Sequence, residues 1–459
     1  MLSRIPGLID THCHLEMPQF GEDLAEVIIR ASDAGVEALV TVGSDLESAS
    51  LAVGLAERYS QVYCTVGVHP HEAKDFTPEA LGKLREWTGH KKVVAVGETG
   101  LDYHYDHSPR KAQQEVFERH LALALEKDLP VVVHSRKASK DTMRMLRASG
   151  VNKGVMHCFS GSMETAEEAM ALGLYISIAG PVTFKKAEKL KEVARAIPDE
   201  YLLIETDAPY LAPVPMRGKR NEPAYIVHTA SEIASLRGVS PEDVARITSL
   251  NARRLFGLPG ISEAGAIAYK IRGSLYLNIT NRCTNRCSFC VRFRSDYVKG
   301  HRLRLAGEPS VEEIEAAIGE PSSYDEVVFC GYGEPLLRLE AVKEVASWVK
   351  RRGGRVRINT NGHGNLIHGR NILPELEGLV DTVSVSLDAQ DPKTYEKLCA
   401  PQFPNAFEEV LAFIKEAKAY IPDVQATVVD MEGVDLEKCR ALAEGLGVKL
   451  RVRRLHVVG

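Results

Sequence analysis

Two histidines separated by a single residue, His12 and His14, are the first side chains of the chain with the chemistry of a metal site. They end the apolar run 7–13, which predicts a β-strand, and a strand points alternate side chains toward the same face. Two imidazoles on one face can bind one divalent ion. An isolated His-x-His pair is equally consistent with ordinary core or surface histidines, so the interpretation depends on other residues.

Four further polar side chains follow short apolar runs, namely Glu98, His134, His157 and Asp207. Imidazole and carboxylate in this mixture suit Zn, Mn, Fe, Ni or Mg, and six ligands are enough for two ions bridged by Glu98. Two such ions lower the pKa of a bound water and stabilise charge on attacking and leaving oxygens, which predicts a hydrolase. We expect Asp207 to bind an ion or to accept the proton of the attacking water, so Glu98 and Asp207 are the predicted catalytic residues.

Eight short apolar runs predict the strands that position these side chains, and amphipathic helical stretches separate most of them. The runs are 7–13, 37–42, 62–68, 92–97, 130–134, 153–157, 174–178 and 201–206. Alternating strands and helices predict a parallel sheet, and eight units fit an N-terminal (β/α)8 TIM barrel of the α/β class. Side chains at the carboxyl ends of barrel strands meet at one mouth, and every predicted ligand lies at such an end.

A second α/β domain follows the first. The helical pattern stops at the Gly and Pro residues of 256–260, so we place the first domain at 1–258, a linker at 259–268 and the second domain at 269–459. Strands are expected near 274–279, 326–330, 355–360, 381–387, 424–429 and 448–453, with helices between them. Six βα units predict a partial, open (β/α)6 barrel.

Three cysteines on one loop, Cys283, Cys287 and Cys290, directly follow the predicted strand 274–279. A structural zinc site needs a fourth ligand, and no second cysteine pair or histidine follows at a suitable spacing. Three thiolates around a four-iron cluster leave one iron open to bind a substrate. The spacing therefore favours a [4Fe–4S] cluster over zinc.

Length, charge and cysteine usage limit the class of protein. The 459 residues exceed the size of a single hydrophobic core, and residues 1–265 carry 30 Lys+Arg against 36 Asp+Glu, while 266–459 carry 27 against 26. Neither half has the basic surplus of a protein that grips duplex nucleic acid. The start lacks a signal-peptide layout, no run is long enough to span a membrane, and nine scattered or clustered cysteines suit a reducing compartment, so we expect a cytoplasmic protein without a membrane partner.

Residues 7–258 resemble the TatD family of metal-dependent deoxyribonucleases in the amidohydrolase superfamily. The motifs that carry the resemblance are Asp-Thr-His-Cys-His (10–14), Gly-Val-His-Pro-His (67–71), Gly-Glu-Thr-Gly-Leu-Asp-Tyr (97–103), His-Ser-Arg (134–136), His-Cys-Phe-Ser-Gly (157–161) and Glu-Thr-Asp-Ala-Pro-Tyr-Leu (205–211). The resemblance implies that His12, His14 and Glu98 bind one ion, that Glu98, His134 and His157 bind the other, and that Asp207 completes the site. It also implies substrate contacts by His69, which reaches the substrate phosphate, and by Arg136 and Asn221.

Residues 274–459 resemble the radical S-adenosylmethionine (SAM) superfamily, whose motif has three cysteines with an aromatic residue, here Phe289, before the last. The segments Gly331-Tyr332-Gly333-Glu334-Pro335, 359–362 and 384–388 lie at strand ends in the expected order. The implied SAM-binding residues are Phe289, Gly331, Gly333, Glu334, Asn361, Ser386 and Asp388. Glycine is expected at 331 and 333 because a side chain would keep the ligand away. Ser386 and Asp388 are alternatively strand-end caps.

The resemblance implies reductive cleavage of SAM to a 5′-deoxyadenosyl radical that abstracts a hydrogen atom from a substrate, with flavodoxin or ferredoxin as electron donor. Our hypothesis is a bifunctional enzyme in which a divalent-metal-dependent, deoxyribonuclease-like hydrolase is fused to a radical SAM enzyme, with nucleic acid as the expected substrate of the first half. Two alternatives stay open. The first half hydrolyses a small amide or ester in the pathway of the radical step, or one half is a non-catalytic docking module. The sequence leaves metal identity, both substrates and the oligomeric state undetermined.

Overall fold

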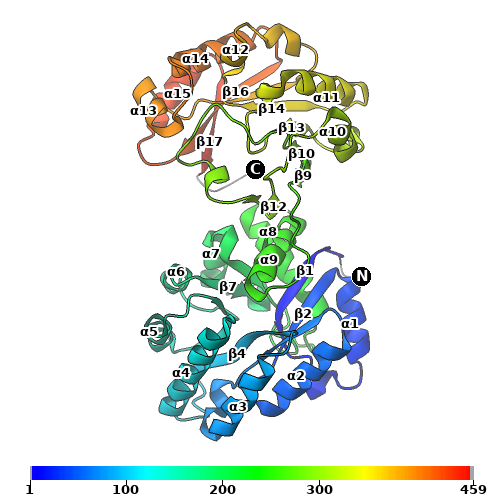
Figure 1. Cartoon of the computed structure of the whole chain (residues 1–459), viewed down its shortest axis with the longest axis vertical. Helices are drawn as coiled ribbons and strands as arrows, with labels where there is room; N and C mark the ends of the chain where they lie inside the picture. The colour runs from blue at the N-terminus through cyan, green and yellow to red at the C-terminus, as the bar shows by residue number, and fades with distance from the viewer. Residues whose placement is uncertain (1–2, 455–459) are drawn as a thin grey trace. The chain divides into compact units, whose positions relative to one another are not determined.

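The structure, a computed structural model, describes residues 3–454 and divides into two units, Met1–Ile261 and Ser262–Gly459 (Figure 1). The division falls within the stretch expected as a linker. Each unit contains its own large cluster of buried apolar side chains. Within the described residues, no helix is both long and apolar enough to span a bilayer.

The first unit is built on an eight-stranded parallel sheet in which the strands follow one another in sequence order. The strands are β1 (Leu8–Cys13), β2 (Val36–Val42), β3 (Val62–Val66), β4 (Val93–Asp102), β5 (Val131–Arg136), β6 (Gly154–Met156), β7 (Leu174–Ile178) and β8 (Leu202–Ile204). A bridge between Cys13 and Ala208, together with the 2.9 Å hydrogen bond from the Asp207 N–H to the His12 carbonyl, joins the two ends of the sheet. The predicted TIM-like barrel is therefore confirmed.

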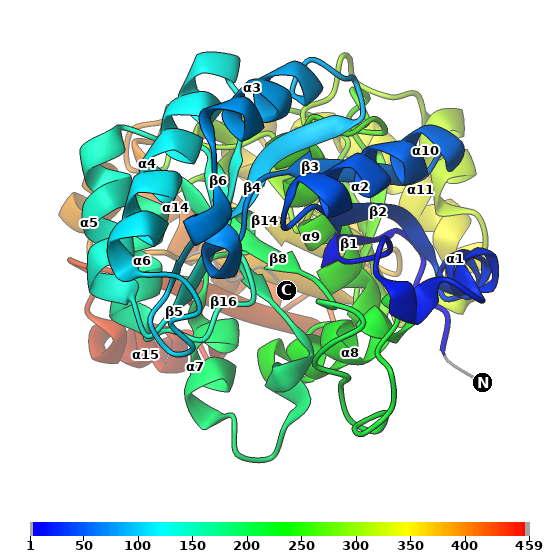
Figure 2. The same cartoon turned by 90° about the horizontal axis from the view of Figure 1, so that it is seen from below.

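Nine α-helices accompany these strands within the described residues, and Figure 2 shows α1 to α8 arranged around the strands. They are α1 (Leu24–Asp33), α2 (Leu46–Arg58), α3 (Pro78–Trp87), α4 (Arg110–Lys127), α5 (Ser139–Ser149), α6 (Met163–Ala171), α7 (Glu188–Ala196), α8 (Ile226–Arg237) and α9 (Pro241–Phe256). Because helices cover the sheet, its strands are buried along almost their whole length, as in other parallel sheets. A capping box at Ser240 starts α9, and Gly257 (φ 64°) ends it.

The second unit contains an open, mostly parallel sheet of seven strands in the order β17-β16-β15-β14-β13-β10-β9. Its parallel strands are β10 (Ser274–Leu277), β13 (Val327–Phe329), β14 (Val356–Thr360), β15 (Thr382–Ser386), β16 (Asp423–Asp430) and β17 (Lys449–Arg454). These six correspond to the predicted strands and confirm the partial barrel. The edge strand β9 (Ala268–Ile271) pairs antiparallel with β10 and was not predicted, because four residues at the end of a linker carry no clear periodicity.

The helices of this unit are α10 (Val311–Ile318), α11 (Leu339–Arg351), α12 (Gly364–His368), α13 (Pro392–Cys399), α14 (Ala406–Ala417) and α15 (Leu436–Gly445). A two-stranded hairpin, β11 (Tyr297–Val298) with β12 (His301–Arg302), follows the cysteine loop. The cysteines lie after β10, and the other expected SAM-binding segments follow β13, β14 and β15. All of them therefore lie at the carboxyl ends of neighbouring strands.

Candidate functional site

The first cluster of metal-ligating atoms lies where β1 ends. The Nε2 atom of His12 is 3.3 Å from His14 Nε2 and 3.4 Å from Glu98 Oε2. Asp207 Oδ1 lies 3.7 Å from the first histidine nitrogen and 3.5 Å from the second. Ligands about 2.1 Å from one tetrahedral ion are separated by roughly 3.4 Å, so these four atoms have the spacing of a single metal site.

A second cluster faces the other oxygen of the same glutamate. Glu98 Oε1 lies 2.7 Å from His157 Nε2 and 2.8 Å from His134 Nδ1, and these two nitrogens are 3.3 Å apart. One carboxylate thus presents one oxygen to each group of ligands. This is the arrangement of a carboxylate that bridges two ions.

An irregularity in β4 places Glu98 between the two groups. The pairing of β4 with β5 shifts register between Val96 and Thr99, which is the effect of a β-bulge that redirects a side chain. Gly100 has φ 141°, and a Cβ atom there would lie 2.0 Å from the His134 carbonyl oxygen. Only glycine allows the two strands to approach so closely, and the approach brings Glu98 to the His134 ring.

Carboxylates behind the ligands hold the histidine rings. His134 Nε2 lies 3.3 Å from Asp102 Oδ2, His157 Nδ1 lies 3.3 Å from Glu205 Oε1, and His14 Nδ1 lies 3.2 Å from Glu16 Oε1. Such partners fix ring orientation and make imidazole a stronger ligand. The sequence analysis gave these three acids no role. For Asp102 and Glu205 the available signal was their position in the same motifs as the ligands.

The donor set fits divalent ions. Glu98 is only 3 % exposed. Burial opposes its ionisation, but the charge of His157 and hydrogen bonds from His12 and His134 hold its pKa well below the usual value. Behind the ligands, His12 Nδ1 and Glu205 Oε2 are buried without a hydrogen-bond partner among the described residues. An ionised bridging carboxylate surrounded by imidazoles is a ligand set that matches two divalent cations.

Two of the three expected substrate contacts lie near the ligands. His69 Nε2 is 3.5 Å from Glu98 Oε1, and its Nδ1 accepts a hydrogen bond from the His71 N–H at 3.1 Å. Burial lowers the pKa of His69 well below its ordinary value, so the ring is neutral and carries its hydrogen on Nε2, which faces the ligands. Arg136 is exposed at the end of β5, with its guanidinium 4.6 Å from the centre of the Tyr105 ring.

Asn221 has a different place from the one expected. Its side chain is fully buried, and its amide donates to the carbonyl oxygens of Thr206 at 2.9 Å and Tyr210 at 2.6 Å, while its side-chain oxygen accepts from the Glu222 N–H. These bonds use the amide to hold the loop after β8. Asn221 therefore positions this loop and does not contact the substrate directly.

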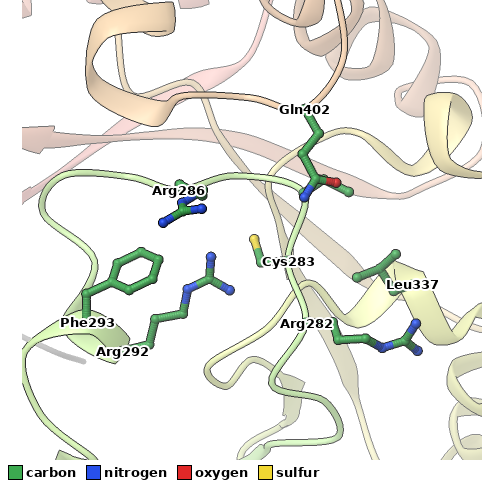
Figure 3. A pocket seen from close by; sticks show the side chains of 8 residues that line it. Arg282, Cys283, Arg286, Arg292, Phe293, Leu337 and Gln402 are labelled. Carbon is green, nitrogen blue, oxygen red and sulfur yellow. The ribbon is translucent and has the colours of Figure 1, made fainter.

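One cysteine of the second unit, Cys283, lines a cavity of about 530 Å³ (Figure 3). The Cys283 sulfur points into the space between Arg286, Arg292 and Gln402. This sulfur also accepts hydrogen bonds from the Asn285 N–H at 3.4 Å and from Asn361 Nδ2 at 3.8 Å. Burial raises the pKa of the Cys283 thiol to about 12, and a bound metal cation would favour the thiolate.

The three cysteines of the loop after β10 are ligands of the type that an iron–sulfur cluster needs. Among the described residues, every set of three or more potential ligand atoms within 4.8 Å of one another belongs to the first unit, so the sulfurs of Cys283, Cys287 and Cys290 are not all within 4.8 Å of one another. Three thiolates can hold a four-iron cluster with one iron open.

A buried network that the sequence analysis missed supports the cysteine loop. The Thr284 hydroxyl lies 2.7 Å from Asn361 Nδ2 and 2.9 Å from His363 Nδ1. The other nitrogen of His363 lies 3.1 Å from the Tyr395 hydroxyl, which accepts from Asn285 Nδ2 at 3.1 Å. Burial lowers the pKa of His363 to about 4, so the network contains a neutral imidazole. Asn361 is thus both an expected SAM contact and a support for the loop.

The glycines of the segment after β13 have another reason than the expected one, which was room for the ligand. A Cβ atom at Gly331 would lie 2.2 Å from Asn278 Oδ1, and one at Gly333 would lie 2.3 Å from the Arg282 carbonyl oxygen. The protein itself therefore excludes side chains at both positions, whether or not a ligand is bound. Glu334 is buried and accepts from the Asn361 N–H at 2.7 Å and the Thr360 hydroxyl at 2.8 Å, while burial raises its pKa to about 7.

The remaining expected cofactor residues lie nearby. Asp388, after β15, is buried and lies 3.2 Å from an Arg453 nitrogen, and burial raises its pKa. Ser386 ends β15 and hydrogen-bonds Asp388. Phe289 packs against the apolar core of the unit. Ser386 and Asp388 thus make the strand-end capping interaction at the carboxyl end of β15.

Comparison with known proteins agrees with both sites. The model of TatD-related DNases matches residues 9–257, and the model of the radical SAM superfamily matches residues 277–445. An uncharacterized metal-dependent hydrolase, YabD of Bacillus subtilis, is 48 % identical over 251 residues, which are 54 % of this chain and 98 % of that protein.

Two further relatives match the same part of the chain. A protein of Klebsiella pneumoniae named 3'-5' ssDNA/RNA exonuclease TatD is 36 % identical over 258 residues, covering 55 % of this chain and 98 % of its own. The crystal structure of YJJV, a TatD homologue of Escherichia coli K12, has a TM-score of 0.54 and 33 % identity over 56 % of this chain and 100 % of its own. The chain belongs to the family of TatD-related DNases and carries a radical SAM domain in its second unit.

Proposed function

We propose that the first unit is a divalent-metal-dependent phosphodiesterase that removes nucleotides from nucleic acid in the manner of an exonuclease. The observation that carries the proposal is the division of Glu98, whose two oxygens face separate groups of histidines. The printed name of the Klebsiella relative supports nucleic acid as the substrate. Two bound divalent ions supply an activated water and stabilise charge on the oxygens of a phosphate.

The chain's own residues have distinct roles in this proposal. His12, His14 and Asp207 would hold one ion, His134 and His157 would hold the other, and Glu98 would serve both. Asp207 also accepts a proton from the attacking water, because its carboxylate lies at the mouth of the site and is 13 % exposed. His69 donates its Nε2 hydrogen to a phosphate oxygen, and Arg136 contacts the substrate from the rim of the barrel.

In the second unit we propose that Cys283, Cys287 and Cys290 bind a [4Fe–4S] cluster that receives electrons from a flavodoxin or ferredoxin. Such a cluster with SAM supplies reductive cleavage of a carbon–sulfur bond, giving a 5′-deoxyadenosyl radical that takes hydrogen from a substrate. Phe289, Gly331, Gly333, Glu334, Asn361, Ser386 and Asp388 form the SAM side of the site. The bonds from Asn285 and Asn361 to the Cys283 sulfur orient this ligand.

The test of both assignments uses the anaerobically reconstituted full chain. Hydrolysis of single-stranded DNA, RNA and a panel of amides and esters is measured with added Mn²⁺ or Zn²⁺, and 5′-deoxyadenosine is measured after addition of dithionite and SAM. We expect His12→Ala to abolish nucleic-acid hydrolysis only, and Cys283→Ala to abolish 5′-deoxyadenosine only. An active amidase without nuclease activity would refute the phosphodiesterase assignment.

A further inference from the structure

The loops after β7 and β8 concentrate positive charge at the mouth of the first barrel. Residues 179–187 and 208–221 contain no Asp or Glu, although acidic residues outnumber basic ones in 1–265. Five exposed basic side chains lie on these loops. Arg220 is paired with Asp23 at 2.7 Å, and the other four are Lys185, Lys186, Arg217 and Lys219. We call these four residues the basic rim. The local charge is thus opposite to that of the unit as a whole.

The two loops pack against each other and form one surface. The Val214 N–H donates to the Thr183 hydroxyl at 2.8 Å, and the Arg217 guanidinium lies 4.2 Å from the centre of the Phe184 ring. A Cβ atom on Gly180 would lie 2.5 Å from the Leu211 carbonyl oxygen, so the backbones are in close contact. The residues of the basic rim therefore lie on two loops that are packed together, and these loops form one surface.

Tyr210 connects this surface to the metal ligands. Its ring is 46 % exposed and lies 6.2 Å from the His14 ring. Its N–H donates to the Asp207 carbonyl at 2.9 Å, and its carbonyl accepts from Asn221 at 2.6 Å. An exposed aromatic ring on a backbone fixed from both sides is a suitable platform for stacking a nucleobase.

We propose that Tyr210 and the basic rim form a binding site for single-stranded nucleic acid, with one base stacked on Tyr210 and the adjoining phosphates crossing the basic rim. The proposal rests on the phosphodiesterase function proposed above. A single strand fits better than a duplex, because Tyr210 needs an unpaired base and because His14 and Glu98 are only 5 % and 3 % exposed. Four cations also provide far fewer phosphate contacts than large duplex-binding surfaces do.

Binding is measured with the full chain in EDTA, using the fluorescence anisotropy of a labelled oligothymidylate of about ten nucleotides over a range of KCl concentrations. The double variant Arg217→Gln/Lys219→Gln should reduce the slope of log K against log salt by about 1.4, the value for two lost phosphate contacts on a single strand. Tyr210→Ala should weaken binding about tenfold with little change in that slope. Arg58→Gln/Lys91→Gln, which alters exposed cations before β3 and β4, is the matched control and should retain the wild-type slope.

Hydrolysis of bis(p-nitrophenyl) phosphate with Mn²⁺ separates the two proposals, because this small diester has a single phosphate and therefore no adjoining phosphates to cross the basic rim. In the Arg217→Gln/Lys219→Gln variant the ratio of oligonucleotide to small-diester kcat/KM should fall about tenfold. An unchanged salt slope in this variant, or equally tight binding of a duplex of the same length, would overturn the nucleic-acid site. A changed slope in a protein that hydrolyses neither substrate would support the site and overturn the phosphodiesterase assignment.

Discussion

The buried carboxylate of Glu98 determines what the first site can bind. An ionised group with 3 % exposure is costly unless cations or hydrogen-bond donors compensate it, and here imidazoles surround both oxygens. The outer acids Asp102, Glu205 and Glu16 in turn hold three of the rings. The strength of metal binding should therefore depend on residues that never touch the ions.

Glu205 gives the first prediction at the residue scale. Its Oε1 accepts from the Cys158 N–H at 2.6 Å and lies 3.3 Å from His157 Nδ1, so Glu205→Gln should weaken metal binding by about 10- to 100-fold. Competition of Zn²⁺ between the protein and a chelator measures the change, with circular dichroism to check folding. Glu72→Gln, which alters an exposed acid, is the control. Equal affinities in the two variants would contradict the role of Glu205.

His120 predicts a pH dependence of stability. Its Nδ1 donates to the Val116 carbonyl at 2.8 Å, its Nε2 accepts from the Val68 N–H at 3.0 Å, and burial lowers its pKa to about 4. Because the unfolded chain binds the proton first, the stability that this residue contributes is complete above about pH 6.5 and is lost as the pH falls toward 4.

From about pH 7 to about pH 5 the loss from this single group is roughly 2 kcal/mol. His120→Gln should therefore make the free energy of unfolding of the first unit less dependent on pH by about this amount. Urea unfolding at the two pH values measures it. An identical pH dependence in the variant and the wild type would show that His120 is protonated in the folded state.

At the scale of elements, β4 is the strand that brings the two ligand groups together. All ten of its residues are buried, and its pairing shifts register on both sides, between Cys64 and Thr65 against β3 and between Val96 and Thr99 against β5. Parallel strands place their carboxyl ends on one edge of the sheet. The alternation of side chains along a strand does not by itself bring one carboxylate between two groups of histidines. The bulge and its glycines supply the necessary displacement.

Two glycine substitutions test whether the close approach of β4 and β5 positions the metal ligands. Gly100→Ala places a Cβ atom 2.0 Å from the His134 carbonyl oxygen, which should destabilise the first unit by more than about 3 kcal/mol and reduce bound metal. Gly54→Ala, within α2 and without any atom within 4 Å of the new Cβ, should stabilise the same unit by about 0.5–1 kcal/mol. Urea unfolding and metal analysis provide the measurements. Similar effects of the two changes would mean that β4 and β5 can separate without cost.

At the scale of the whole molecule, the chain consists of two units with separate apolar cores and separate predicted cofactors. The curated relatives reported above cover only the first unit, so the second unit is an addition to the family's usual length. A domain with its own core can remain folded without its neighbour. We therefore expect the two chemistries to be separable.

Cleavage after Glu263 tests this separability, because residues 259–264 between the two cores are exposed. A glutamate-specific protease applied under anaerobic conditions should release two folded fragments, with metal-dependent hydrolysis in the first and 5′-deoxyadenosine formation in the second. Glu263→Gln is the control and should slow cleavage at this position. Loss of both activities on cleavage, with the fragments still folded, would show that the units depend on each other.

The secondary-structure elements and the types of ligand follow from the order of the amino acids. The strands of both sheets, apart from β9 and the short hairpin, were predicted because buried parallel strands are short apolar runs, and their polar ends identified Glu98, Asp207 and the four histidines. The barrel rule then predicted that these distant residues meet. Cysteine spacing alone indicated a cluster, since local spacing fixes which thiols share a loop.

Which atoms face one another depends on how distant segments pack in the folded chain. Asn221 and the glycines at 331 and 333 proved to be packing positions, because burial and close backbone contacts depend on segments far away in the sequence. The support of the histidine rings by Glu205 and Asp102, and of the cysteine loop by His363, arises in the same way. Periodicity specifies the face on which a side chain lies, whereas its partner is set by the three-dimensional register of separate strands and loops.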